Sequence, residues 1–134
     1  KNAVPEMISN KEQYISLSTR KKDGSFVDTP VWFAQDGTTK SFYLYSVKEA
    51  GKIKSIRNFA AVKIAHCNYR GKLKGDWVDA TAELIHAPEG IQLAYSHLRK
   101  KYGIKFRIGD LFSWLTGNIH RRQFLKISIK TNDA

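Results

Sequence analysis

The sequence predicts a mainly β protein, a small antiparallel barrel of six strands accompanied by short helices. Three observations support this prediction: runs of alternating apolar and polar residues, glycine-containing turns between these runs, and stretches with helical periodicity. The chain has 134 residues, of which 42% are hydrophobic, so we expect one domain, residues 1–134, around a single core. Antiparallel strands this numerous in so short a chain usually close into a barrel.

The first three predicted strands come from the amino-terminal half. Residues Tyr14–Arg20 alternate apolar and polar, which is the pattern of a half-buried strand. Asp23-Gly24 supplies a hairpin turn, and Phe26–Ala34 follows as a second strand. Within it Pro30 lacks an N–H group and so belongs at a sheet edge or a bulge. Another Asp-Gly turn leads to the third strand, Ser41–Val47, and together the three strands predict an antiparallel meander.

Helical periodicity follows the third strand. Ile53, Ile56 and Ala60 share one face of a short helix that begins at Gly51. Further along the chain, Pro88 is placed to start a longer helix and Gly103 to end it. The other expected elements are strands at Ala61–Tyr69, Trp77–Ile85 and Gln123–Lys130, and a second helical piece at Ile108–Gly117 before the last strand.

The charge of the chain favours anionic ligands. Its formal net charge is +11, which attracts nucleic acid, acidic membrane surfaces or phosphorylated small molecules. No apolar run is long enough to span a bilayer, and the first residues lack the apolar core of a signal peptide. Cys67 is the only cysteine, and with no secretory signal we expect a cytoplasmic protein without a disulfide. The four histidines show no metal-ligand spacing, so no metal site is predicted.

The cations after the third strand are the strongest functional signal in the residues themselves. Lys52, Lys54 and Arg57 lie at the start of the predicted short helix, and Ser46 precedes them on the strand. Free N–H groups and the helix dipole favour an anion at such an end, so these residues are candidates for holding a phosphate. The alternative interpretation is an ordinary solvated basic helix face.

Three motifs in order resemble the pyridoxamine 5'-phosphate oxidase-like split-barrel flavoproteins, and among them the branch described as dependent on coenzyme F420. The pattern R-x-D-G-x-x-x-x-T-P-V-W-F corresponds to Arg20 or Lys21 through Phe33. G-K-x-K-x-x-R corresponds to Gly51–Arg57, and A-x-C-x-x-R-G to Ala65–Gly71. The resemblance implies a homodimer of split β-barrels with FMN or coenzyme F420 in a groove between the subunits. The choice between these two cofactors is open.

The resemblance also assigns candidate roles to individual residues. Lys52 matches the lysine that holds the phosphate in the family, and the segment Thr29, Pro30, Val31 and Trp32 matches positions that line the ring. Alternatively, Val31 belongs to the core and Trp32 caps the rim of the barrel. Trp77 covers the cofactor or fills the dimer interface. Cys67 matches a family cysteine but is more simply a small buried hydrophobe, so no catalytic residue is named.

The function predicted from these features is a flavin-dependent oxidoreductase that exchanges a hydride or electrons with a small molecule. A first alternative is a split barrel that binds flavin, haem or a tetrapyrrole without turnover. A second is a basic β-barrel that binds single-stranded nucleic acid through aromatic residues such as Phe42, Tyr43 and Tyr45, although neighbours on a strand face opposite sides. Vitamin B6 oxidation is disfavoured, because the ending of the printed sequence does not match the Arg/Trp-rich segment of true pyridoxamine phosphate oxidases.

Overall fold

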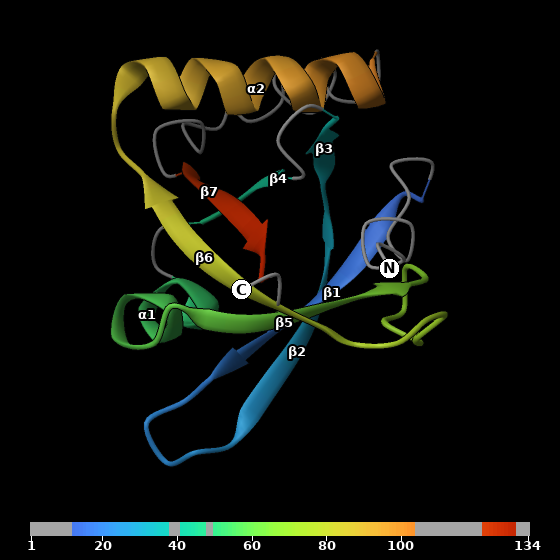
Figure 1. The fold of residues 1–134 in the computed structure, drawn as a ribbon, viewed down its shortest axis with the longest axis vertical. Coiled ribbons are helices and arrows are strands. Elements are labelled where there is room, and N and C mark those ends of the chain that lie inside the picture. The colour runs from blue at the N-terminus through green and yellow to red at the C-terminus, as the bar shows by residue number, and fades with distance from the viewer. Residues whose placement is uncertain (1–11, 38–40, 48–49, 104–121, 131–134) are drawn as a thin grey trace.

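A computed structural model describes residues 12–37, 41–47, 50–103 and 122–130, and these residues form one curled antiparallel sheet with two helices (Figure 1). The strand order across the sheet is β2-β1-β5-β6-β7-β4-β3. The strands are β1 (Tyr14–Arg20), β2 (Phe26–Trp32), β3 (Ala34–Asp36), β4 (Ser41–Val47), β5 (Ala61–Cys67), β6 (Val78–Ile85) and β7 (Arg122–Ile129). The helices are α1 (Gly51–Asn58), between β4 and β5, and α2 (Pro88–Tyr102), between β6 and β7.

The mainly β prediction is confirmed, but the count of six strands is wrong for the described part of the chain, where seven are present. The predicted second strand divides at Phe33 into β2, which pairs with β1, and β3, which pairs with β4. At the division, the Tyr102 hydroxyl accepts a hydrogen bond from the Phe33 N–H at 2.9 Å and lies 2.8 Å from the Phe33 carbonyl oxygen. The hydroxyl therefore supplies the acceptor for the Phe33 N–H and can donate its proton to the Phe33 carbonyl, groups that a ladder partner would otherwise hold.

The first hairpin follows its predicted chemistry. Asp23 accepts hydrogen bonds from the backbone N–H and the hydroxyl of Ser25, and Gly24 has a φ of +91° that other residues rarely adopt. β2 lies at one edge of the sheet, where the missing N–H of Pro30 costs least. The predicted meander is corrected, since β4 pairs with β3 and β7 rather than with β2.

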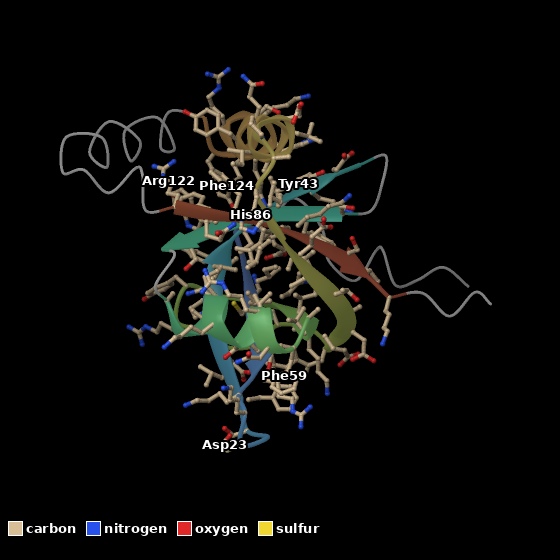
Figure 2. The ribbon with its side chains drawn as sticks, turned by 90° about the vertical axis from the view of Figure 1, so that its left-hand side faces the viewer. Asp23, Tyr43, Phe59, His86, Arg122 and Phe124 are labelled. Carbon is tan, nitrogen blue, oxygen red and sulfur yellow. The ribbon has the colours of Figure 1, made fainter. Side chains whose placement is uncertain are left out.

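The core consists of two clusters on the two faces of the sheet. The larger cluster fills the curl of the sheet, where Ile15, Leu17 and Leu44 meet Ile53 and Ile56 of α1. The smaller cluster lies under α2, whose Ala94 and Leu98 pack on outward-facing residues such as Tyr43 and Phe124. Figure 2 shows α2 above Tyr43 and Phe124 and the Asp23 turn at the opposite end of the molecule, beyond α1. Each helix therefore covers a different side of the sheet.

α2 has the predicted ends, since it begins with Pro88 and is followed by Gly103, whose φ is +57°. α1 differs from the prediction, because it ends at Asn58, and Ala60, which was expected on its apolar face, lies beyond it and is exposed. The sixth strand begins at Val78, one residue after the predicted start. The helical piece expected at Ile108–Gly117 lies outside the described residues. Among the residues that the structure describes, no helix is both long and apolar enough to cross a membrane.

Candidate anion and cofactor site

A cleft with a cationic lining lies between the β1–β2 turn and α1. Its volume is about 570 Å³, and the described residues that line it include four cations and no carboxylate. We call it the cationic cleft. One side of the cleft is a face of α1, because residues three, four and seven positions apart in a helix, such as Gly51, Lys54, Ser55 and Asn58, lie on the same face. The lining residues are Lys21, Lys22, Gly51, Lys54, Ser55, Arg57 and Asn58. The structure thus brings Lys54 and Arg57 together with two lysines from the β1–β2 turn.

Lys52 occupies a different environment from its two predicted partners. Its side chain is half-buried, and burial lowers the pKa of its ammonium group below the ordinary value. In the described part of the chain, the salt bridges that form do not include Lys52, and no carboxylate offsets its desolvation. A half-buried cation without a counter-charge is unfavourable unless an anion joins it.

The amino end of α1 is open to a further acceptor. No side chain in the described part of the chain caps it, and its first turn holds no acidic residue. The N–H groups of Ile53 and Lys54 both bond to the Ala50 carbonyl, at 3.0 and 3.3 Å. Ser46 shares the face of β4 that carries the buried Phe42, so it lies on the side of the sheet that α1 covers.

The four predicted ring-lining residues of β2 do not present their side chains to one surface. Val31 is 8% exposed and belongs to the core, while Thr29 lies on the same face of the strand. Pro30 and Trp32 lie on the opposite face, where Trp32 stacks on Tyr102 with ring centroids 4.4 Å apart and planes 11° apart. The core role of Val31 is therefore the one that the structure shows. A ring-binding role for this segment stays a prediction that involves its backbone.

The structure also gives the surroundings of Cys67 and Trp77, and of His66 beside Cys67. Cys67 is buried, and burial raises the pKa of its thiol, which disfavours the reactive thiolate. Burial lowers the pKa of His66, the neighbour of Cys67 on β5. Trp77 is partly buried just before β6. Among the described residues, no group of three or more His, Cys, Asp or Glu side chains is placed to hold a metal ion.

Comparisons with known proteins identify the fold. The sequence matches no protein-family model and no curated protein. Among solved structures, a candidate 5-nitroimidazole antibiotic resistance protein from Bacteroides thetaiotaomicron is similar with a TM-score of 0.69 and 17% identity, over 98% of this chain and 81% of that one. HutZ, the heme storage protein from Vibrio cholerae, has a TM-score of 0.66 and 11% identity, over 91% of this chain and 84% of that one. A FAD-binding protein from Mesorhizobium loti has a TM-score of 0.61 and 19% identity, over 91% and 82%.

This chain has the split-barrel fold of the pyridoxamine 5'-phosphate oxidase-like proteins. The resemblance inferred from the three motifs is confirmed at the level of the fold. The solved structures differ in what they bind or do, since one is a heme storage protein, one binds FAD and another is an F420 reductase. The F420 reductase has a TM-score of 0.57 and 14% identity, over 91% of this chain and 90% of that one.

Sequence reasoning missed two residues of the cationic cleft of this split barrel. The sequence predicts Lys21 as a possible start of the family pattern and both lysines as part of the turn segment, but nothing local places that turn beside α1. The usable signal was their position, directly before Asp23-Gly24 at a hairpin tip, together with a second cationic segment at Lys52–Arg57. A phosphate needs several cations, and the fold supplies them from two segments about 30 residues apart.

Proposed function

We propose that this split barrel binds a phosphate-bearing flavin-type cofactor at α1, either FMN or coenzyme F420, and acts as an oxidoreductase on a small molecule. The observation that carries the proposal is the half-buried Lys52 ammonium group, which has no counter-charge in the described residues and adjoins the uncapped start of α1. A phosphate would remove the cost of desolvating this cation. The cationic cleft beside it would attract the same group.

The chain supplies binding and orientation in this proposal. Lys52 contacts the phosphate directly, and the Ser46 hydroxyl donates a further hydrogen bond. Lys54 and Arg57 steer the anion toward α1 from the cationic cleft. The segment Thr29–Trp32 positions the ring through its backbone, and Trp77 covers the ring from a second subunit of a homodimer. When bound, the cofactor supplies the redox chemistry, so no ionisable catalytic side chain is required.

The decisive experiment compares ligands with and without a phosphate. The purified protein is titrated with FMN, with riboflavin and with coenzyme F420, and binding is followed by the fluorescence of each ligand. We expect FMN or coenzyme F420 to bind, and Lys52→Met to weaken that binding by about 10- to 150-fold, the range of one charged hydrogen bond. If FMN is the ligand, riboflavin should bind the wild type and the variant equally.

The control is Lys100→Met, at an exposed position of α2, which should leave every affinity unchanged. Equal cofactor affinities for the Lys52→Met and Lys100→Met proteins would contradict the assignment of Lys52. Failure of the wild-type protein to bind either cofactor would refute the flavin proposal as a whole.

A second candidate function is haem binding without turnover, and the likeness to a heme storage protein supports it. The carboxylates of haem would suit the cationic cleft as well as a phosphate would. A hemin titration followed in the Soret band tests it, and a haem complex that excludes FMN would favour this function. The nucleic-acid alternative is weakened, because two of its three aromatic residues on β4, Phe42 and Tyr43, are 0% and 3% exposed.

A further inference from the structure

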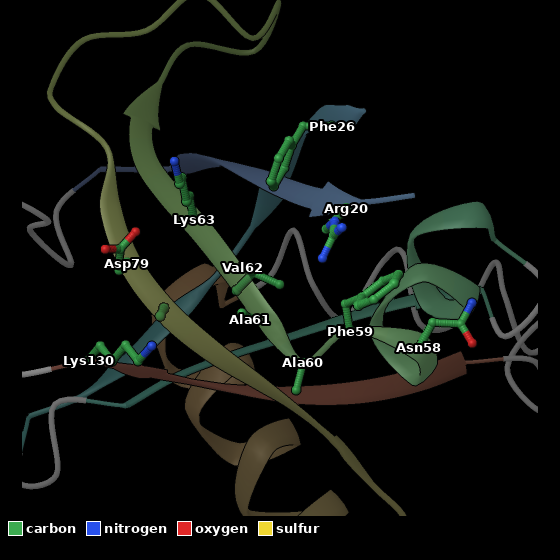
Figure 3. Close-up of a pocket in the computed structure, with 11 residues that line it drawn as sticks. Arg20, Phe26, Asn58, Phe59, Ala60, Ala61, Val62, Lys63, Asp79 and Lys130 are labelled. Carbon is green, nitrogen blue, oxygen red and sulfur yellow. The ribbon is translucent and has the colours of Figure 1, made fainter. Parts of the chain in front are cut away.

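A second cleft is lined by residues of β1, β2, β5 and β6 and by Asn58, the last residue of α1 (Figure 3). We call it the aromatic cleft. Its volume is about 570 Å³, within the range of pockets that hold small molecules. Its lining residues are Arg20, Phe26, Asn58, Phe59, Ala60, Ala61, Val62, Lys63, Asp79, Ala80 and Lys130. It shares only Asn58 with the lining of the cationic cleft and is therefore a separate cavity.

Two aromatic rings with a cation over each form the walls of the aromatic cleft. The Arg20 guanidinium carbon lies 4.5 Å from the centre of the Phe59 ring. The Lys63 ammonium lies 5.7 Å from the centre of the Phe26 ring. Register explains the arrangement, because Arg20 and Phe26 are cross-strand partners on one face of the hairpin. Phe26 is 50% exposed, so part of its ring is available to a ligand.

The charge on this cleft is positive. Among its described lining residues, Arg20, Lys63 and Lys130 supply three cations, and Asp79 supplies one carboxylate. Between them the lining includes the exposed Ala60 and Ala61, with Val62 and Ala80, which are buried in the larger core cluster, beneath. An occupant that satisfies both features has an apolar, flat body and carries a negative charge.

A second copy of this chain fits the aromatic cleft poorly. In a two-fold symmetric contact, the same patch faces itself, so the three cations of one copy would oppose the three of the other. Like charges brought together in this way oppose association. Charge and cavity size therefore both favour a small organic anion over another protein surface.

We propose that the aromatic cleft binds a small organic anion with a planar apolar body and one carboxylate, sulfonate or phosphate group. Phe26 and Phe59 contact the body of the ligand, and Arg20 with Lys63 holds its negative group. This site is independent of the cofactor proposed at α1, and the protein can have either without the other.

The test uses two fluorescent probes that share their rings and differ in charge. The anion is 8-anilinonaphthalene-1-sulfonate, and the neutral counterpart is N-phenyl-1-naphthylamine. We expect the sulfonate to bind the full-length protein more tightly, and Arg20→Gln to weaken sulfonate binding about tenfold with little effect on the neutral probe. Phe59→Ala should weaken both probes, because it removes a wall of the cleft.

The matched control is Arg99→Gln, since Arg99 also lies over an aromatic ring, that of Tyr95 at 5.8 Å, in a shallow exposed cleft on α2. This variant should bind both probes as the wild type does. Equal sulfonate affinities for the Arg20→Gln and Arg99→Gln proteins would overturn the proposal. A loss of sulfonate binding with Lys54→Gln but not with Arg20→Gln would also overturn it, because the probe would then occupy the cationic cleft.

Two further measurements keep the result decisive. Arg20 is exposed, so Arg20→Gln should keep the thermal midpoint of the wild type and decides the question even if Phe59→Ala does not fold. Sedimentation at two protein concentrations, with and without the sulfonate, reports competition with self-association. Displacement of the probe as the protein associates would assign the cleft to a second copy and overturn the proposal. An FMN titration of Arg20→Gln that matches the wild type would show that the flavin site is unaffected.

Discussion

The substitution Tyr102→Phe removes one oxygen atom from the point where the predicted second strand divides. That oxygen accepts the Phe33 N–H at 2.9 Å and lies 2.8 Å from the carbonyl oxygens of both Gln13 and Phe33. A hydroxyl has one proton, so it donates to one carbonyl at a time while accepting the N–H. Burial raises the pKa of Tyr102, in keeping with a hydroxyl held inside the protein.

The expected cost follows from what the substitution leaves behind. The ring stays, and with it the stacking on Trp32 at 4.4 Å, so little apolar packing is lost. Phe33 is 0% exposed, so its N–H group would remain buried without an acceptor. A buried polar group left in this way costs about 1 to 3 kcal/mol. We therefore expect the free energy of unfolding to fall by about 2 kcal/mol, which is a factor of about 30 in the folding equilibrium.

Urea denaturation measures this change, with an unchanged dependence on urea concentration showing that the folded state remains compact. The control is Tyr69→Phe, because Tyr69 is 64% exposed and its hydroxyl contacts only the adjacent Arg70 among the bonds described, at 3.0 Å. The control should change stability by less than about 0.5 kcal/mol. If Tyr102→Phe changes it no more than that, the hydroxyl is not what holds the β2–β3 bend. Faster hydrogen exchange of the Phe33 amide in the variant would locate the effect there.

Three other substitutions have definite expected outcomes. Ile53→Ala should lower the free energy of unfolding, measured by urea denaturation, by about 2 to 5 kcal/mol, because Ile53 is 0% exposed in the larger core cluster. A loss below about 1 kcal/mol would mean that Ile53 does not anchor α1 to that cluster. Gly71→Ala should lower the thermal midpoint, because Gly71 has a φ of +88°, even though the added methyl would meet Pro30 only at 3.7 Å; an unchanged midpoint would contradict this backbone argument. Burial lowers the pKa of Lys101 to about 8, so between pH 8 and 10 the unfolded chain binds more protons and stability should rise with pH. Above pH 10 the raised pKa of Tyr102 should reverse this trend. Lys101→Met should reduce the rise, to which Lys52 also contributes because burial lowers its pKa, and should leave the reversal in place.

Local patterns predicted those parts of the fold whose causes are local. The hairpin turn depends on Asp23 and Gly24, which are adjacent in the sequence. The alternation of Tyr14–Arg20 predicted the strand but not its burial, since Ser16 and Ser18 are buried together with the apolar residues. α2 depends on Pro88 at its start and Gly103 at its end, and both are readable from the sequence. The likeness to flavoproteins came from motifs in order rather than from any one motif, and the fold agrees with it.

The features that sequence reasoning missed depend on residues far apart in the chain. The division of the second strand requires Tyr102, which is 69 residues from Phe33. The cationic cleft requires Lys21 and Lys22 to lie beside α1, which only the pairing and curl of the sheet can bring about. Neighbouring residues of a strand, such as Thr29 and Pro30, face opposite sides of the sheet, whereas a motif match gives only their positions in the sequence and not the direction of their side chains.

Helix α1 links stability to ligand binding in a way that one pair of variants can separate. Eight residues are too few for a helix that stands alone, since isolated helices shorter than about 12 to 15 residues are marginal, so burial of Ile53 and Ile56 must hold α1 in place. Ile53→Ala should therefore reduce stability and cofactor affinity together. Lys52→Met keeps an apolar side chain and removes a half-buried charge, so it should increase the stability of the free protein while it reduces cofactor affinity. Urea denaturation and cofactor titration of both variants would show these opposite signs. A Lys52→Met protein that is less stable than the wild type would mean that this lysine serves the fold rather than an anion.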